Sequence, residues 1–144
     1  MATWSEFETA APELAERVKE RLQAHKHLTI ATIRKDGSPR ISGTECVIED
    51  GTLRIGSMSG ALKAKDLQRD PRFALHSGSD DPSKDWAGDA KVAGVAREVP
   101  NDDDSHRFEL DLTEASWVRV NEEQTHLLID IWTAAGGLKH VKRL

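Results

Sequence analysis

The sequence predicts an α+β fold in which a mostly antiparallel barrel or sandwich carries a few helices. Two Asp-Gly pairs, Asp36-Gly37 and Asp50-Gly51, separate strand-like runs in the manner of β-hairpins. Other segments repeat apolar residues with the period of a helix. Alternating strand–helix–strand units of a parallel sheet are absent. We therefore expect three helices and six or seven strands in a single domain spanning residues 1–144.

The first predicted helix covers residues 12–24. Its apolar residues recur every four positions, and charged residues fill the opposite face. Pro12 suits the first helical turn, where a backbone N–H would have no partner. A short turn at residues 4–9 is expected before this helix.

The hairpin signals divide the next part of the chain into three predicted strands. These strands run over Leu28–Arg34, Pro39–Glu49 and Thr52–Met58. A second helix is predicted over Ala61–Asp70, because its apolar residues have helical spacing and Pro71 stops it.

The remaining elements are predicted from shorter patterns. Strands at Arg72–Ser77 and Ala90–Val99 flank a polar loop, residues 78–89. The acidic run at residues 102–104 predicts the start of a third helix reaching about Leu112, because acids are stabilised at a helix N-terminus. The last two predicted strands cover His126–Thr133 and Leu138–Lys142.

The loop at residues 78–89 is expected to be more mobile than its flanking strands, because little of it can be buried. Trp86 is its only large aromatic residue. We expect Trp86 to anchor the loop on the barrel, with a lid over a binding site as the alternative.

The composition restricts the class of protein. A net charge of −5 argues against binding to nucleic-acid phosphates. No apolar run is long enough for a membrane span, and the N-terminus has no signal-peptide pattern. The single cysteine, Cys46, fits a reducing compartment and is interpreted as a small hydrophobic residue. We expect a cytoplasmic protein that binds neither nucleic acid nor membrane.

The junction between the strand ending near Ser57 and the following helix has the features of a phosphate site. Free N–H groups at a helix start bind anions, and the hydroxyls of Ser57 and Ser59 lie nearby in the sequence. Lys63 lies in the first helical turn, where the helix dipole disfavours a cation by roughly 0.3–1 kcal/mol. A bound anion would remove that penalty. Alternatively, Lys63 is a surface lysine balanced by Asp66.

Three short patterns follow one another in order along the chain. They are Asp36-Gly37-Ser38-Pro39-Arg40, Gly51-Thr52-Leu53 and Lys63-Ala64-Lys65-Asp66-Leu67-Gln68-Arg69-Asp70-Pro71-Arg72. Together, over about residues 12–99, they resemble the pyridoxamine 5′-phosphate oxidase-related family of FMN-binding split β-barrels, within the flavin and deazaflavin oxidoreductase superfamily. The resemblance implies a split β-barrel and a homodimer with two cofactor sites at its interface.

The resemblance also implies where a cofactor binds. Lys63 falls on the family's phosphate-binding lysine and Ser57 on a small hydroxylated position at the strand end, while Arg40–Gly43 fall on the strand lining the ring system. Trp132 matches a C-terminal aromatic that often covers the cofactor from the partner chain, with a core tryptophan as the alternative. The expected cofactor-binding set is Arg40, Ile41, Ser42, Gly43, Ser57, Met58, Ser59, Lys63 and Trp132.

Two departures from the family pattern accompany these matches. The family often has Ser-Arg directly before the lysine, where this chain has Ala61-Leu62. The C-terminal arginine and histidine that hold pyridoxine phosphate in the oxidase itself have no match here.

The function implied by the resemblance is hydride transfer through bound FMN to or from a small molecule. The deazaflavin coenzyme F-420 is an alternative cofactor, and a non-catalytic module that binds flavin or haem is an alternative function. The sequence identifies no catalytic residue. Asp102 and His106 have metal-ligand spacing on the predicted third helix, but we interpret them as a solvated helix face and expect no metal site.

Overall fold

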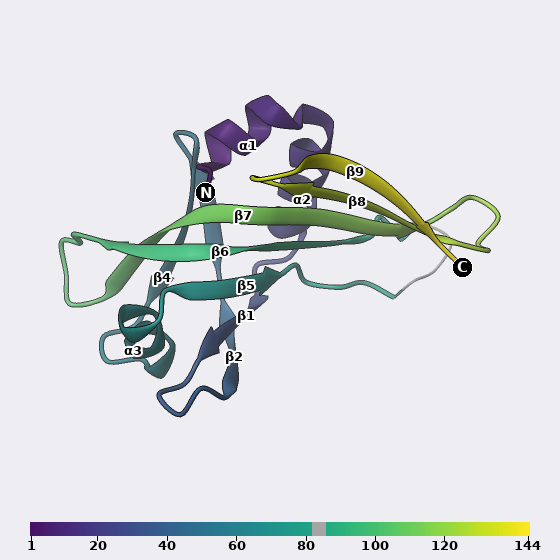
Figure 1. Ribbon diagram of the computed structural model, residues 1–144. Coiled ribbons are helices and arrows are strands. Elements are labelled where there is room, and N and C mark those ends of the chain that lie inside the picture. The colour runs from purple at the N-terminus through teal and green to yellow at the C-terminus, as the bar shows by residue number, and fades with distance from the viewer. Residues whose placement is uncertain (82–85) are drawn as a thin grey trace.

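Nine strands and three helices make up the part of the chain that the computed structural model describes, residues 1–81 and 86–144 (Figure 1). The helices are α1 (Trp4–Ala10), α2 (Pro12–Ala24) and α3 (Leu62–Arg69). The strands are β1 (Leu28–Ile33), β2 (Pro39–Thr44), β3 (Cys46–Glu49), β4 (Thr52–Ser57), β5 (Arg72–His76), β6 (Asp89–Val99), β7 (His106–Val120), β8 (Leu127–Thr133) and β9 (Gly137–Arg143). They form one antiparallel sheet in the order β2-β1-β5-β6-β7-β4-β3, with the β8–β9 hairpin added beside β7. The sheet is not closed, and the predicted α+β split barrel is confirmed.

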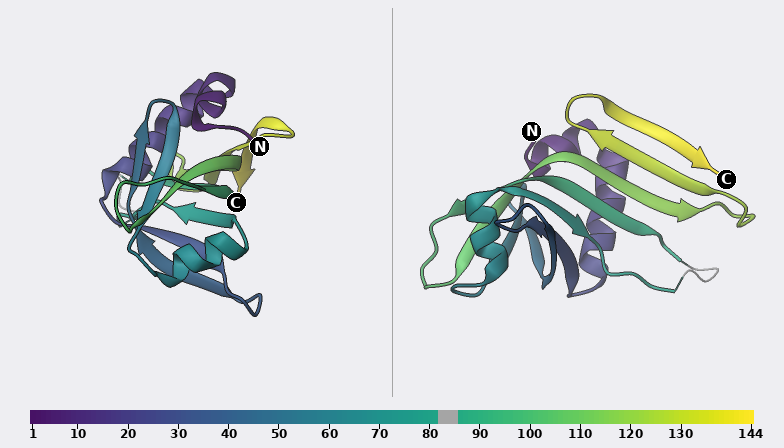
Figure 2. Two further views of the ribbon diagram at one scale, coloured as in Figure 1. Left: turned by 90° about the vertical axis from the view of Figure 1, so that its left-hand side faces the viewer. Right: turned by 60° about the horizontal axis from the view of Figure 1, so that its bottom comes forward.

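β7 is the longest strand, and it changes partners along one of its edges. Residues 106–110 pair with β4, whereas residues 114–120 pair with β8. β6 pairs along the other edge of β7. The sheet therefore extends into the β8–β9 hairpin at one end of β7, while α3 lies toward the other end (Figure 2).

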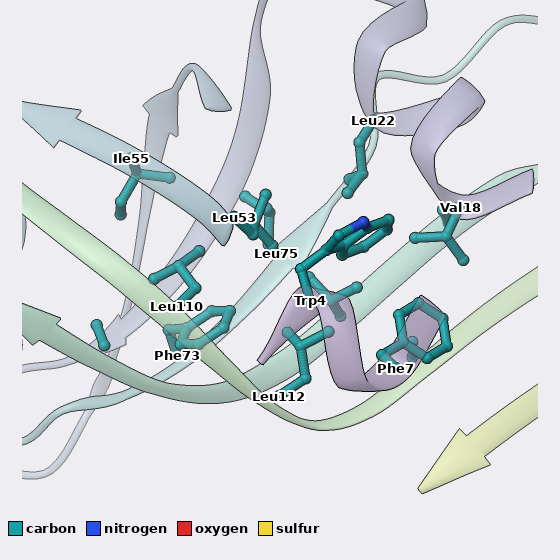
Figure 3. Close-up of a cluster of buried hydrophobic side chains, with 14 of the residues drawn as sticks. Trp4, Phe7, Val18, Leu22, Leu53, Ile55, Phe73, Leu75, Leu110 and Leu112 are labelled. Atoms are coloured by element: carbon teal, nitrogen blue, oxygen red, sulfur yellow. The ribbon is translucent and has the colours of Figure 1, made fainter. Parts of the chain in front are cut away.

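The apolar face of the sheet is covered by α1 and α2. Trp4 and Phe7 of α1 are almost fully buried, as are Val18 and Leu22 of α2. Figure 3 shows them facing the strand residues Leu53, Phe73, Leu75, Leu110 and Leu112. This cluster is the main hydrophobic core of the described chain.

Most of the predicted elements are confirmed. The helices expected over residues 12–24 and 61–70 are α2 and α3. Six of the predicted strands agree with β1, β4, β5, β6, β8 and β9 to within one residue at each end.

The third helix predicted toward Leu112 is wrong, because this segment begins β7. Phe108, Leu110 and Leu112 alternate with outward polar residues, and pairing on both edges of β7 outweighs the helix-start signal of the acidic run. The acidic run forms a turn instead, in which Asp103 accepts a hydrogen bond from the backbone N–H of Ser105.

Two smaller predictions are also corrected. Residues 39–49 form two strands, because the chain leaves its pairing with β1 at Glu45 and then pairs with β4. The turn expected at residues 4–9 is the helix α1. Its N-terminus has a capping box, in which Thr3 and Glu6 satisfy each other's backbone N–H groups.

The loop between β5 and β6 is described only in part, because residues 82–85 lie outside the described residues. Trp86 is half-buried, and the indole N–H of Trp117 donates to the carbonyl of Ala87 at 2.9 Å. The expected mobility of residues 78–89 stays a prediction. Within the described ranges, no helix is long and apolar enough to cross a membrane.

A buried carboxylate ties α3 to the sheet. Asp66 is 2% exposed and accepts hydrogen bonds from Thr32 of β1 (2.8 Å), Arg40 of β2 (2.7 Å) and Arg69 of α3 (3.0 Å). Burial alone would raise the pKa of Asp66, but the hydrogen bonds from Arg40, Thr32 and Arg69 outweigh it and hold the pKa below its usual value. These three hydrogen bonds, called the Asp66 clamp below, hold α3 in place against β1 and β2.

Replacing Asp66 by Asn keeps the side-chain size and removes the charge that Arg40 and Arg69 share. We expect the free energy of unfolding in urea to fall by about 2–3 kcal/mol, since two arginines lose their counter-ion. Asp70→Asn is the control, because its partner Arg72 is exposed and its effect should be much smaller. Equal losses in the two variants would contradict the clamp.

The contribution of Asp66 depends on pH in a defined direction. Its folded-state pKa is depressed, so the stabilisation is present above the unfolded-state pKa of about 3.9 and is lost as pH falls through the folded value. The stability difference between wild type and Asp66→Asn should therefore shrink on acidification below about pH 4. Urea titrations of both proteins at several pH values around and below about 4 measure this difference. A stability difference that grew on acidification would contradict the prediction.

Candidate functional site

A groove of about 670 Å³ opens where the end of β2, the β3–β4 hairpin, the start of α3 and the start of β7 meet. Its volume lies within the range of small-molecule sites. The lining residues include His27, Gly43, Glu45, Val47, Glu49, Arg54, Gly56, Ser57, Met58, Lys63, His106 and Arg107. Cationic side chains outnumber acidic ones in this lining, which favours an anionic ligand.

Ser57 supplies a buried hydroxyl at the end of β4. The residue is 7% exposed, and its Oγ has no hydrogen-bond partner in the described part of the chain. A buried polar group left unsatisfied costs about 1–3 kcal/mol. Since Ser57 lines the groove, a ligand acceptor there would satisfy it.

The start of α3 also lacks a protein cap. Ala61 occupies the N-cap position of α3, and no described side chain caps it, in contrast to the capping box of α1. Free N–H groups and the helix dipole favour an anion at this position. The uncapped end of α3 lies at the same groove as Ser57, which strengthens the case for a bound oxyanion.

Lys63 brings a positive charge to the same place. Its Nζ donates one hydrogen bond to the carbonyl of Gly43 at 2.8 Å, which leaves two of its three hydrogens for a ligand. Burial lowers the pKa of Lys63, and the negative charge of Glu45 opposes this shift. The alternative that Asp66 balances Lys63 is wrong, because Asp66 pairs with Arg40 and Arg69.

His106 forms a hydrogen-bonded cluster at the edge of the groove. Its Nδ1 lies 2.7 Å from Oε2 of Glu98, and Nε2 of Gln68 donates to the other carboxylate oxygen, Oε1, at 2.8 Å. These hydrogen bonds, from Gln68 and from His106, lower the pKa of Glu98. The ionised carboxylate favours a proton on Nδ1, and Nε2 then accepts from the N–H of Gly60 at 3.4 Å. The cluster thus holds the turn that precedes α3.

The structure brings together some of the sequence-predicted site residues and not others. Gly43, Ser57, Met58 and Lys63 line the groove. The residues that do not line it are Arg40, Ile41, Ser42, Ser59 and Trp132.

Two of these have identifiable places elsewhere. Arg40 is paired with Asp66 and so belongs to the clamp. Trp132 is 5% exposed, and its ring lies 4.8 Å from that of Phe7, so within this chain it is a core residue.

Most other lining residues were not identified from the sequence, among them Arg54, His106 and Arg107. Arg54 and Arg107 are outward residues of β4 and β7, and the alternating pattern from residue 106 would have indicated Arg107 had it been interpreted as a strand. Pairing of β4 with β7 then places Gly56 opposite Arg107.

These features define a split-barrel protein with a groove suited to an anionic small molecule. A sequence model described as pyridoxamine 5′-phosphate oxidase matches residues 14–130, and the chain belongs to this family. The resemblance noted in the sequence is confirmed. A search of curated proteins gives no match.

Solved structures share the fold at low sequence identity. HutZ, described as a heme storage protein from Vibrio cholerae, is 19% identical, with 72% of this chain and 89% of that chain covered at a TM-score of 0.55. PhzG from Burkholderia lata 383, in complex with tetrahydrophenazine-1-carboxylic acid, is 11% identical (94% and 90% covered, TM-score 0.64). A structure described as F420 reductase is 16% identical (67% and 94% covered, TM-score 0.54). Similar folds therefore serve proteins with different ligands.

The unpartnered hydroxyl of Ser57 predicts an unusual effect on stability. In ligand-free protein, Ser57→Ala should leave the free energy of unfolding unchanged or raise it by about 1 kcal/mol, because a buried unsatisfied group is removed. Ser77 is the matched control: it is 3% exposed, but its Oγ accepts from the N–H of Ala90 at 3.0 Å. Ser77→Ala should therefore lose about 1 kcal/mol in urea denaturation. A similar loss in both variants would show that Ser57 has a partner in the fold.

Proposed function

We propose that this protein binds FMN in the groove and acts as a flavin-dependent oxidoreductase on a small molecule. The observation that carries the proposal is the buried Ser57 hydroxyl, which has no partner in the described structure and lines the same groove as Lys63 in the uncapped first turn of α3. Hydroxyl, free N–H groups and ammonium together suit a phosphate monoester. Membership of the family supports a flavin as the molecule that carries the phosphate.

The residues present fit the phosphate of FMN in charge and in hydrogen-bonding capacity. Ser57 donates its O–H, the first turn of α3 donates backbone N–H groups, and Lys63 supplies the positive charge. Leu62, in the position where the family often has arginine, is 56% exposed and apolar. Lys63 is therefore the main cation of the phosphate site in this chain.

FMN supplies hydride transfer when bound, so the protein needs no nucleophile of its own. The chain's contribution is to bind and orient. The Cys46 thiol stays protonated at neutral pH, because burial raises its pKa to about 11. The ionised Glu98 holds the proton of His106 on Nδ1 and keeps the turn before α3 in place.

A second candidate function is a non-catalytic module that binds flavin or haem. It is favoured by His27 and His106, which place two imidazoles in the lining of the groove. The coenzyme F-420 is the alternative for a catalytic protein, since it also carries a phosphate. Absorption spectroscopy separates the three, because flavin, deazaflavin and haem have different bands, and bleaching by a nicotinamide donor separates turnover from storage.

The proposal includes a cytoplasmic homodimer. Several apolar side chains are exposed at or near the groove: Val47 (46%) and Met58 (81%) line it, Leu62 precedes Lys63, and Ile41 (74%) lies two residues before Gly43. Exposed apolar patches of this kind are typical of protein interfaces. A second copy of the chain would cover them and enclose the groove.

Light scattering should give a particle of about twice the 16.0 kDa chain mass at micromolar concentration. Replacing Met58 by Asp should shift the particle toward the monomer, because a charge would then be buried at the interface. Lys65→Asp, on the exposed surface of α3, is the control and should remain dimeric. A wild-type particle of monomer mass would contradict the dimer.

Lys63→Ala should weaken FMN binding by about ten- to a hundredfold, because a charge-assisted hydrogen bond is worth roughly 1.5–3 kcal/mol. Riboflavin lacks the phosphate, so its weaker binding should hardly change in Lys63→Ala. Fluorescence titrations of both ligands measure this contrast, with Lys65→Ala on the exposed side of α3 as the matched control. Equal losses for the two ligands, or no loss for FMN, would remove Lys63 from the phosphate site.

A further inference from the structure

Arg107 differs from the other buried and half-buried arginines, because its side chain forms no hydrogen bond or ion pair with any described residue. The others have acidic partners: Arg21 pairs with Asp80, Arg40 with Asp66, Arg54 with Glu109, and Arg119 with Asp130. Arg107 is half-buried and lines the groove. Its charge is therefore not used within the described fold.

The sheet register explains why Arg107 has no partner among the residues that the structure describes. On the outer face of β7, its direct neighbours are Gly56 of β4 and Val99 of β6. Neither has a side chain that can accept a hydrogen bond. The nearest acid on the same face of β7 is Glu109, which already lies near Arg54 (3.6 Å) and Arg97 (3.2 Å).

Gly56 opens the floor of the groove beside Arg107. A Cβ at this position would meet only the carbonyl oxygen of His106, at 3.8 Å, so the space above the backbone is open. A glycine within a strand often marks a place where a ligand approaches the backbone. Arg54 lies two residues before Gly56 and also lines the groove. The Nε of Arg54 is buried and has no hydrogen bond within the described part of the chain, since its 3.6 Å separation from Glu109 is too long for one.

We propose that Arg107, with Arg54 beside it, binds the carboxylate of a small organic acid above Gly56. The planar guanidinium presents two parallel N–H groups that match the two oxygens of a carboxylate. The cation of the proposed phosphate site, Lys63, belongs to α3, whereas Arg107 belongs to β7. Ser57, the hydroxyl donor to the phosphate, ends β4 beside Gly56. The inference that a carboxylate binds at Arg107 is independent of the proposed function. The inference that this acid is the substrate rests on the proposed function.

Benzoate and benzamide are matched probes, because they share size and shape but only benzoate is charged. Benzoate should bind FMN-loaded wild-type protein and perturb the flavin absorption, and Arg107→Gln should weaken it by about ten- to a hundredfold. The binding of benzamide should change little in Arg107→Gln. Arg107→Lys keeps the charge but not the paired N–H groups, so its loss of benzoate affinity should lie between those of wild type and Arg107→Gln. Arg34→Gln is the control, because Arg34 is exposed in the β1–β2 hairpin and does not line the groove.

The same variants separate this proposal from the cofactor proposal. FMN affinity should be nearly unchanged in Arg107→Gln, and a loss of FMN with benzoate unaffected would assign Arg107 to the cofactor and overturn the carboxylate site. If wild type bound no FMN, benzoate titration followed by the amide resonance of Gly56 would still test Arg107 in the ligand-free protein. Absence of benzoate binding in wild type, or equal losses of benzoate and benzamide, would overturn the proposal.

Discussion

The buried carboxylate of Asp66 is the interaction on which the candidate site depends. It joins β1, β2 and α3 through Thr32, Arg40 and Arg69, and Arg69 also donates to the carbonyl of Ile33. Because these strands lie in the sheet, α3 cannot slide or rotate without breaking the clamp. The start of α3 is thereby held next to the end of β2, where Lys63 reaches Gly43. A preorganised anion site needs this kind of support.

β7 provides the second constraint, because its length lets one strand serve two parts of the molecule. Its buried residues between Phe108 and Ala115 join the core, and residues 114–120 carry β8. Its first residues bring His106 and Arg107 beside β4. Strand pairing thus places the His106 imidazole at the groove, together with the Arg107 guanidinium, which has no partner among the described residues. Since Lys63 belongs to α3 and Arg107 to β7, two anionic groups of bound molecules would have separate cationic partners. This division agrees with a phosphate-bearing cofactor and an acidic substrate.

The sequence predicted the fold class and most strands because these follow from local patterns, and it singled out Lys63, which lines the groove. Asp-Gly turns fix the hairpins, and the family pattern ending in Asp70-Pro71-Arg72 fixes α3. Features that depend on non-local pairing were missed. The acidic run at residues 102–104 resembles a helix start, and only the ladders to β4 and β6 decide that β7 begins there. Arg40 was expected at the cofactor, and in the fold its side chain forms an ion pair with Asp66 of α3.

Native mass spectrometry of the protein, after incubation with equal amounts of FMN and riboflavin, tests the central claim most directly. The central claim is that the groove recognises its ligand through a phosphate. It predicts that the protein retains FMN in clear excess over riboflavin. Equal occupancy by the two flavins, or retention of neither, would contradict a phosphate site formed by Ser57, Lys63 and the start of α3.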